Sequence, residues 1–180
     1  TIRSSRSAPR NNTRRDAGIA MSSRGSQMEK NDLFFIREAI GEAKKASALG
    51  EVPVGCVLAI DGKIISRGHN LKESKKNALL HAEMVAIDKA IKKMKTPILP
   101  EATIYVTLEP CLMCAGAIFQ TRIKRVVFGA FEPKFGVLGS ILSLQNEERF
   151  NHRIEVTAGI CRKEIEKMMK DFFRELRNKD

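Results

Sequence analysis

The sequence predicts an α/β protein: one domain with three layers in the order α/β/α. Segments in which apolar residues recur with helical spacing alternate along the chain with short apolar, β-branched runs. The last segment has the clearest apolar stripe, with charged residues on its other face. A length of 180 residues, 43% of them hydrophobic, fits one globular domain with a sizeable core. No internal repeat or second folded domain is expected.

The spacing of apolar residues and the positions of turn residues define ten expected elements. The expected helices are residues 31–49, 81–94, 110–121, 137–144 and 165–176. The expected strands are residues 54–60, 63–68, 103–107, 125–129 and 154–157.

Capping and turn residues support the elements in the first half of the chain. Asn31 or Asp32 serves as the N-cap of the first helix, because a short polar side chain can accept a free backbone N–H there. Gly50 follows the last helical residue, where glycine adopts the left-handed conformation at no cost. The dipeptide at residues 61–62, Asp-Gly, is a hairpin signal and joins the first two strands.

Proline and β-branched residues support the elements in the second half. Pro97 ends the helix over residues 81–94, and Pro110 suits the first position of the next helix, where its missing N–H has no partner to lose. The β-branched run at residues 103–107 indicates a buried strand. In the closing helix, the apolar stripe makes packing in the core the expected role of Phe172, with Phe173 balanced between core and surface.

Residues 1–28 form a basic tail that is expected to be disordered, and residues 29–180 form the folded domain. The tail contains six arginines and one aspartate, a net charge of +5, and almost no large apolar residue. Its composition also fits an organelle transit segment, a remnant of an expression vector, or an upstream extension, since Met21 and Met28 could each be a start.

The net charge of +11 favours a polyanionic partner. The domain without the tail still carries 26 basic and 20 acidic residues, a net charge of +6. The alternative is that this balance only aids solubility. No apolar run approaches the roughly 20 residues that cross a bilayer, so a soluble protein without a membrane partner is expected.

The four cysteines indicate reduced thiols and a metal site more than a disulfide framework. Cys111 and Cys114 form a C-x-x-C pair with a histidine upstream, and no secretory signal is visible. A thioredoxin-like redox pair is the competing interpretation, and the adjacent Pro110 and upstream His-x-Glu favour metal binding. Cys56 and Cys161 lack ligand spacing and are expected to be structural.

His81, Glu83, Cys111 and Cys114 form the pattern H-x-E followed by P-C-x-x-C, the signature of zinc-dependent nucleobase deaminases. The histidine and the two cysteines make three zinc ligands, which leaves a fourth position for water, as in catalytic sites. Glu83 has no need to bind the metal and could carry a proton from that water to a ring nitrogen and to departing ammonia. The alternative is an ordinary glutamate that stabilises the start of a helix.

The wider sequence resembles the bacterial-type tRNA adenosine deaminases (TadA-type) of the cytidine-deaminase-like superfamily. The resemblance extends over about residues 31–177. The segments that carry it are residues 50–55, 68–70, 81–83, 105–111, 114–116, 125–130, 139–140, 151–153 and 171–174.

The resemblance implies a homodimer that converts adenosine to inosine at the wobble position of a tRNA anticodon. It implies a mixed five-stranded sheet and one zinc ion (Zn²⁺) per subunit. A cytoplasmic location is expected, or an organelle if residues 1–28 are a native transit segment. The anticodon stem-loop would be the partner. By position, Asn70, Ala82, Ala130 and Glu132 correspond to residues that contact the substrate, with Ala82 contributing its backbone.

One departure from the family pattern adjoins the zinc histidine. Residues 78–80, Ala-Leu-Leu, stand where the family commonly has Pro-Thr-Ala or a similar tripeptide. Two other functions stay open from the residues alone. One is a deaminase of a free base or nucleotide, such as guanine, cytosine or dCMP. The other is a non-catalytic, zinc-stabilised RNA-binding subunit, which the presence of Glu83 disfavours.

Overall fold

The computed structural model describes residues 13–178, and for residues 13–24 and 26 it describes the backbone alone. The chain divides into two compact units, Thr1–Lys30 and Asn31–Asp180. The second unit contains the whole sheet.

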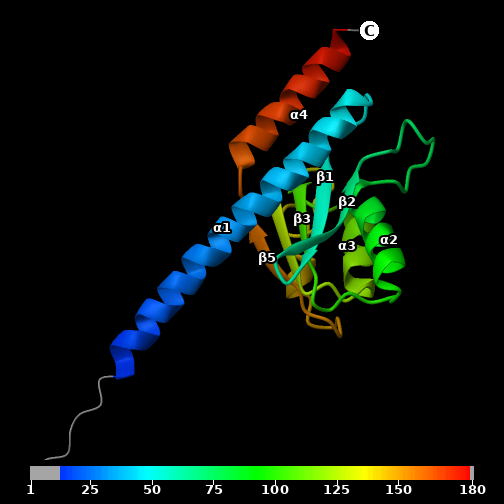
Figure 1. The fold of residues 1–180 in the computed structure, drawn as a ribbon. Helices are drawn as coiled ribbons and strands as arrows, with labels where there is room; N and C mark the ends of the chain where they lie inside the picture. The colour runs from blue at the N-terminus through cyan, green and yellow to red at the C-terminus, as the bar shows by residue number, and fades with distance from the viewer. Residues whose placement is uncertain (1–12, 179–180) are drawn as a thin grey trace, which may run out of the picture. The chain divides into compact units, whose positions relative to one another are not determined.

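Four α-helices and five strands make up the described part of the chain (Figure 1). In chain order they are α1 (Thr13–Ala48), β1 (Gly55–Ile60), β2 (Lys63–His69), α2 (Ala82–Met94), β3 (Thr103–Leu108), α3 (Leu112–Gln120), β4 (Arg125–Ala130), the 3₁₀ turn η1 (Leu144–Asn146), β5 (Glu155–Ala158) and α4 (Arg162–Arg177). Within residues 13–178, no helix is both long and apolar enough to cross a membrane.

The strands form one mixed five-stranded sheet, as the family resemblance implies, and their order is β2-β1-β3-β4-β5. β1 pairs antiparallel with both β2 and β3, and β3, β4 and β5 pair in parallel. All strands except β1 therefore run in the same direction. Their carboxyl ends meet at one edge of the sheet, which is where open α/β sheets place their binding sites.

Helices cover both faces of the sheet, which confirms the three-layer α/β/α fold (Figure 1). α2 and α3 cover one face, where Ala86, Ile104 and Phe128 belong to the larger core cluster. α1 and α4 cover the other face, where Ile36 and Ile165 belong to a second cluster. Because β3 and β4 are covered on both sides, their side chains are almost all buried, as in other parallel sheets.

The helix α1 begins earlier than the sequence predicts. Its backbone is helical from Thr13, whereas the expected N-cap was Asn31 or Asp32. Residues 13–28 include two glycines and three serines and have no apolar stripe, so neither propensity nor periodicity in the sequence indicates a helix there. Residues 1–12 lie outside the described residues, so the disorder expected for them stays a prediction.

The prediction of a short helix at residues 137–144 is wrong. This segment is irregular, with an isolated bridge between Leu138 and Ser143, and the 3₁₀ turn η1 begins at its last residue. Two of its backbone N–H groups, those of Leu138 and Ser140, bind the side chain of Glu109 and not a carbonyl one turn away. Gly139 has a φ of 150°, outside the helical region, and its N–H donates to the carbonyl of Leu142, against the direction of helical hydrogen bonds.

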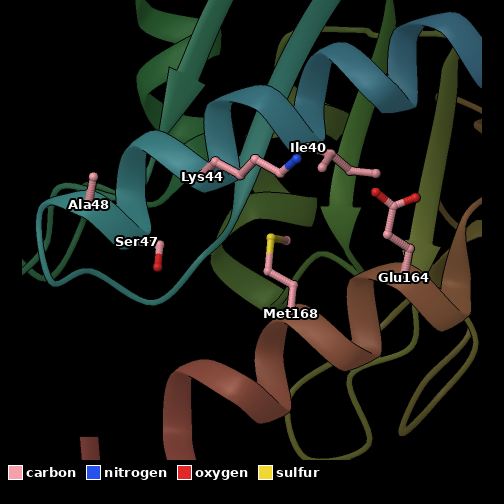
Figure 2. Close-up of a pocket in the computed structure, with 6 residues that line it drawn as sticks. All are labelled: Ile40, Lys44, Ser47, Ala48, Glu164 and Met168. Carbon is pink, nitrogen blue, oxygen red and sulfur yellow. The ribbon is translucent and has the colours of Figure 1, made fainter. Parts of the chain in front are cut away.

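The apolar stripe of α4 is only partly buried. Ile165 is fully buried, whereas Phe172 is half-buried and Phe173 is 39% exposed. A pocket between α1 and α4 is lined by Ile40, Lys44, Ser47, Ala48, Glu164 and Met168 (Figure 2). This pocket lies on the sheet face opposite α2 and α3.

Two lysines of α2 bind the free edge of the sheet. The Nζ atoms of Lys89 and Lys93 donate hydrogen bonds to the carbonyl oxygens of Arg67 and Ile65, at 3.0 and 3.1 Å. β2 is an edge strand, so these carbonyls have no strand partner on that side. The lysines therefore satisfy backbone acceptors that a neighbouring strand would otherwise use.

A buried ion pair joins α1 to the sheet. The Arg125 guanidinium donates two hydrogen bonds to the Asp32 carboxylate, at 2.7 and 2.6 Å, and one to Thr157. The Tyr105 hydroxyl donates to the same carboxylate at 3.1 Å, and burial together with Asp32 raises the pKa of this phenol. The carboxylate of Asp32 thus connects α1 to side chains of both β3 and β4.

Replacement of Asp32 by asparagine should strongly destabilise the domain. Asp32→Asn leaves the Arg125 guanidinium, whose side chain is 11% exposed, without a counter-charge. Removal of one partner of a buried ion pair costs about 3–5 kcal/mol, and urea unfolding should show a loss of this size. Asp88→Asn is the matched control, because Asp88 pairs with Lys92 in solvent and such pairs contribute about 1 kcal/mol or less. Equal losses for the two variants would contradict the prediction.

Candidate active site

His81 is fixed at the carboxyl edge of the sheet because α2 begins in close contact with the end of β2. It immediately precedes α2 and has an extended backbone. Gly68 of β2 permits the contact, since a Cβ atom there would lie 2.3 Å from the carbonyl oxygen of Ala82. The Asn70 side chain accepts the backbone N–H of Ala82 at 2.9 Å. Asn70 therefore caps the first turn of α2, next to His81.

Cys111 and Cys114 lie at the start of α3, just beyond the carboxyl end of β3. Cys111 is the N-cap residue and has an extended backbone. Cys114 occupies the first turn and is fully buried. The backbone N–H of Ala115 donates to the carbonyl of Cys111 at 2.8 Å and closes that turn. The positive end of the helix favours thiolate at both positions.

The three predicted metal ligands come together in the structure. His81 Nδ1 lies 3.7 Å from Cys111 Sγ and 3.6 Å from Cys114 Sγ, and the three donor atoms lie within 4.8 Å of one another. Zinc–sulfur and zinc–nitrogen distances of about 2.3 and 2.0 Å put two ligands of a tetrahedral ion about 3.5 Å apart. The cluster therefore fits a single tetrahedral metal ion.

The pKa values of the two thiols in the cluster shift in opposite directions. A hydrogen bond from the Cys114 thiol lowers the pKa of Cys111 to about 4, against the effect of burial, and His81 lowers it further. The same hydrogen bond, together with burial, raises the pKa of Cys114. The hydrogen bond to Cys111 also raises the pKa of His81. Cys111 thus presents a thiolate, the form in which cysteine binds metals.

Glu83 lies beside the cluster on the first turn of α2 and is 4% exposed. Burial raises its pKa to about 7, although a backbone hydrogen bond and the charge of His81 lower it. A carboxyl group with a pKa near neutrality can both accept and release a proton under physiological conditions. Its position and its pKa suit a proton carrier next to the metal ligands.

The four residues expected to contact substrate have different surroundings, and their role stays a prediction. Ala82 is fully buried at the start of α2. Asn70 is half-exposed and uses its side-chain oxygen on Ala82, which leaves its amide N–H₂ as the group that could reach a ligand. Ala130 is 1% exposed, and its carbonyl accepts the backbone N–H of Glu109. Glu132 is half-buried, and its carboxylate accepts the backbone N–H of Lys134 at 3.0 Å.

Sequence reasoning assigned no role to two buried carboxylates next to the site, Glu51 and Glu109. Both are at most 3% exposed, and both bind backbone N–H groups of loops that flank the metal ligands. The sequence signal that could have indicated such a role is an acidic residue next to a mostly apolar run, as Glu109 is at the end of residues 104–109. A glutamate in such a place needs a hydrogen-bonded partner, but the sequence does not show which loop supplies it.

Glu51 fixes the loop that precedes His81. Its carboxylate accepts the backbone N–H groups of Glu73 and Ser74 at 3.0 and 2.7 Å. Burial raises the pKa of Glu51, and these hydrogen bonds lower it by more, so the net shift is downward. The ionised form of Glu51 therefore holds the loop in place.

The sequence and the fold are both similar to those of known proteins. The model of the MafB19-like deaminase family matches residues 30–177. The tRNA-specific adenosine deaminase of Bacillus subtilis (strain 168) is 53% identical over 148 residues, which cover 82% of this chain and 92% of that protein. A structure from a study of A-to-I editing by tRNA:A34 deaminases at the wobble position of transfer RNA has a TM-score of 0.72 and 36% identity, and the match covers 75% of this chain and 98% of that one.

A guanine deaminase structure from Bacillus subtilis has a TM-score of 0.52 and 35% identity, over 54% of this chain and 63% of that one. The family match and the cluster of His81, Cys111 and Cys114 beside Glu83 define the class of the protein, which is a deaminase. The identity of 53% over nearly the whole domain is more specific. This chain belongs to the tRNA-specific adenosine deaminase family, which confirms the resemblance seen in its sequence.

Replacement of Glu51 by glutamine should destabilise the domain in a pH-dependent way. At neutral pH, Glu51→Gln should lower the free energy of unfolding by about 1–3 kcal/mol, because the buried amide N–H₂ that replaces one carboxylate oxygen cannot accept a backbone N–H. The folded pKa of Glu51 lies below its ordinary value of 4.5, so its contribution is complete above that value and disappears as the pH falls through the folded pKa.

Urea unfolding of wild type and variant, from neutral pH to about pH 3, measures this difference. The exposed carboxylate of Glu73 in the same loop supplies the control Glu73→Gln, which should change stability little at any pH. A difference between wild type and Glu51→Gln that stays constant down to the lowest pH would contradict the assignment.

Proposed function

We propose that this chain converts adenosine to inosine by hydrolysis at the wobble position of tRNA anticodons. The observation that carries the proposal is the high identity to a tRNA-specific adenosine deaminase along nearly the whole domain. The structural neighbour from the study of wobble-position A-to-I editing supports the same substrate. The chain also keeps the ligand cluster and the buried glutamate that this chemistry needs.

The ion in the cluster is proposed to be zinc, one per subunit. His81, Cys111 and Cys114 would hold it, and one imidazole with two thiolates is a donor set that zinc accepts. Bound zinc supplies Lewis-acid activation of a water molecule at neutral pH. Three protein ligands leave a tetrahedral ion one position for that water, which distinguishes a catalytic site from a structural one.

The side chains around the cluster carry out the proton transfers. Glu83 accepts a proton from the attacking water and delivers it to a ring nitrogen of adenine while the new C6–O bond forms. A second proton transfer through Glu83 lets the C6–N bond break and ammonia leave. Adenosine and water thus become inosine and ammonia. Asn70, with its amide oxygen held by Ala82, could orient the nucleoside through its N–H₂ group.

The surface around the site suits an anticodon loop. Lys72, Lys75 and Lys76 are exposed on the loop before His81, where they could meet phosphate groups. The bases of an anticodon are already unpaired, so extrusion of one base into a pocket costs less than from a duplex. Leu79, one of the residues that depart from the family pattern, is 59% exposed two positions before His81. Its side chain would then contact the bound RNA.

A second candidate is the deamination of a free base. The similarity to a guanine deaminase structure favours it, although that match covers a smaller part of this chain than the tRNA deaminase matches do. The basic charge of the domain favours a polyanion over a neutral base. Family resemblance further leads us to propose that the chain acts as a homodimer in the cytoplasm.

The zinc assignment predicts the metal content of the purified protein. Wild type should contain about one zinc ion per chain, measured by elemental analysis. Cys111→Ala and Cys114→Ala should each lose most of it, because two remaining ligands bind zinc weakly. Cys161→Ser is the matched control, since Cys161 lies outside the cluster, and it should keep full zinc content. Stoichiometric zinc in the double variant Cys111→Ala/Cys114→Ala would show that the metal binds elsewhere.

The proposed substrate predicts a selective reaction. An anticodon stem-loop with a wobble adenosine should yield inosine, whereas free adenosine, cytidine and guanine should react far more slowly. Glu83→Gln should keep its zinc and its fold but lose roughly 10²–10⁴-fold in rate, the usual contribution of a general acid–base group. Turnover of guanine without any inosine in the stem-loop would overturn the proposal in favour of the second candidate. Full activity of Glu83→Gln would remove Glu83 from the mechanism.

A further inference from the structure

Glu109 lies between the end of β3 and the ligand Cys111, and its carboxylate is completely hydrogen-bonded. Its Oε2 atom accepts the backbone N–H of Glu132 at 3.0 Å. Its Oε1 atom accepts the backbone N–H groups of Leu138 and Ser140 at 2.9 and 3.0 Å. The Ser140 hydroxyl donates to Oε2 as well. These four donors account for the roughly four acceptor sites that a carboxylate offers.

All four donors belong to one loop, residues 131–140, which follows β4. The loop therefore folds around the carboxylate, and its N–H groups form an anion-binding concavity for a side chain of the protein itself. Each of these donors is a neutral group, so Glu109 is stabilised by dipoles and hydrogen bonds. A buried charge held in this way requires every donor to keep its place, which fixes the shape of the loop.

The same loop is fastened to the metal-ligand segment through its backbone. Gly136 forms an isolated antiparallel bridge with Cys111, and the N–H of Val137 donates to the carbonyl of Pro110 at 3.1 Å. A Cβ atom on Gly136 would lie 2.3 Å from Cδ and Oε2 of Glu109. The glycine thus allows the carboxylate to pack directly against the loop backbone.

The loop begins directly after Ala130 and carries Glu132 and the 67% exposed Phe135. It lies at the carboxyl edge of the sheet, next to the start of α3. The bridge to Cys111 and the hydrogen bond to Pro110 place it beside the segment that carries the metal ligands. Its orientation relative to Cys111 depends on Glu109, which is not one of the three predicted ligands.

We propose that Glu109 is a positioning residue of the deaminase site, which holds the 131–140 loop in the conformation that binds the target nucleotide. The identity of the bound nucleotide rests on the proposed function. The hold of Glu109 on the loop rests on the hydrogen bonds described above. Glu109 acts through the loop, so its loss affects substrate binding more than the chemical step performed beside Glu83.

The test is Glu109→Gln, which keeps the shape of the side chain but turns an N–H₂ group toward N–H donors. We expect KM for the anticodon stem-loop to rise about tenfold or more while kcat changes by less than about threefold. Zinc content should match wild type. Hydrogen exchange at the amides of residues 132, 138 and 140 should become faster, while exchange in α2 should stay the same.

Three further variants separate positioning from general stability. Ser140→Ala removes one of the four donors and should shift KM and loop exchange in the same direction by a smaller factor. Glu109→Asp keeps the charge on a shorter side chain and should recover part of the loss of Glu109→Gln. Glu101→Gln is the control, because Glu101 is exposed and pairs with Lys124 on the surface. It should behave as wild type.

The outcomes separate this inference from the proposed function. If wild-type protein does not edit the stem-loop, the proposed function fails, and the exchange measurements still test whether Glu109 orders the loop. If wild type is active and Glu109→Gln and Ser140→Ala leave both KM and loop exchange unchanged, the positioning role is wrong. A fall in kcat and in zinc content at constant KM would show instead that Glu109 supports the metal ligands.

Discussion

The antiparallel pairing of β1 with both of its neighbours is the constraint on which the active site depends. It makes β2 run parallel to β3, so the chain leaves both strands at the same edge of the sheet. The segment after β2 leads to His81, and the segment after β3 leads to Cys111. A metal cluster assembled from residues 30 positions apart thus follows from strand direction. The buried pair of Asp32 and Arg125 holds α1 to the opposite face of the same sheet.

Buried carboxylates bound to backbone amides fix the loops on both sides of the cluster. Glu51 holds the loop before His81, and Glu109 holds the loop beside Cys111. Loops carry most binding residues because they vary freely, but a loop that moves cannot hold a catalytic geometry. A carboxylate with several donors in one loop restricts it without adding a helix or a strand. The rigidity of this site therefore comes from polar groups as well as from the apolar core.

Local signals predicted the fold and the ligands, and long-range contacts account for what they missed. The spacing of His81, Glu83, Cys111 and Cys114 was enough to predict one cluster, because metal ligands must converge. The helix expected at residues 137–144 failed, because the backbone leaves the helical region at Gly139 and folds around Glu109, about 30 residues earlier in the chain. The early start of α1 was missed for a different reason: capping rules favoured Asn31 or Asp32, and the sequence of the preceding residues has no apolar stripe that would reveal a helix.

The lysines that α2 places along β2 have a consequence for how the molecule can meet its neighbours. An edge strand with unoccupied carbonyls invites another chain to extend the sheet, which is a common route to uncontrolled polymerisation. Lys89 and Lys93 occupy two of these carbonyls and set positive charge along the edge. Two copies of this protein approaching edge to edge would therefore repel each other and find fewer acceptors. Association through helical or loop surfaces stays open, so this edge helps to keep any assembly finite.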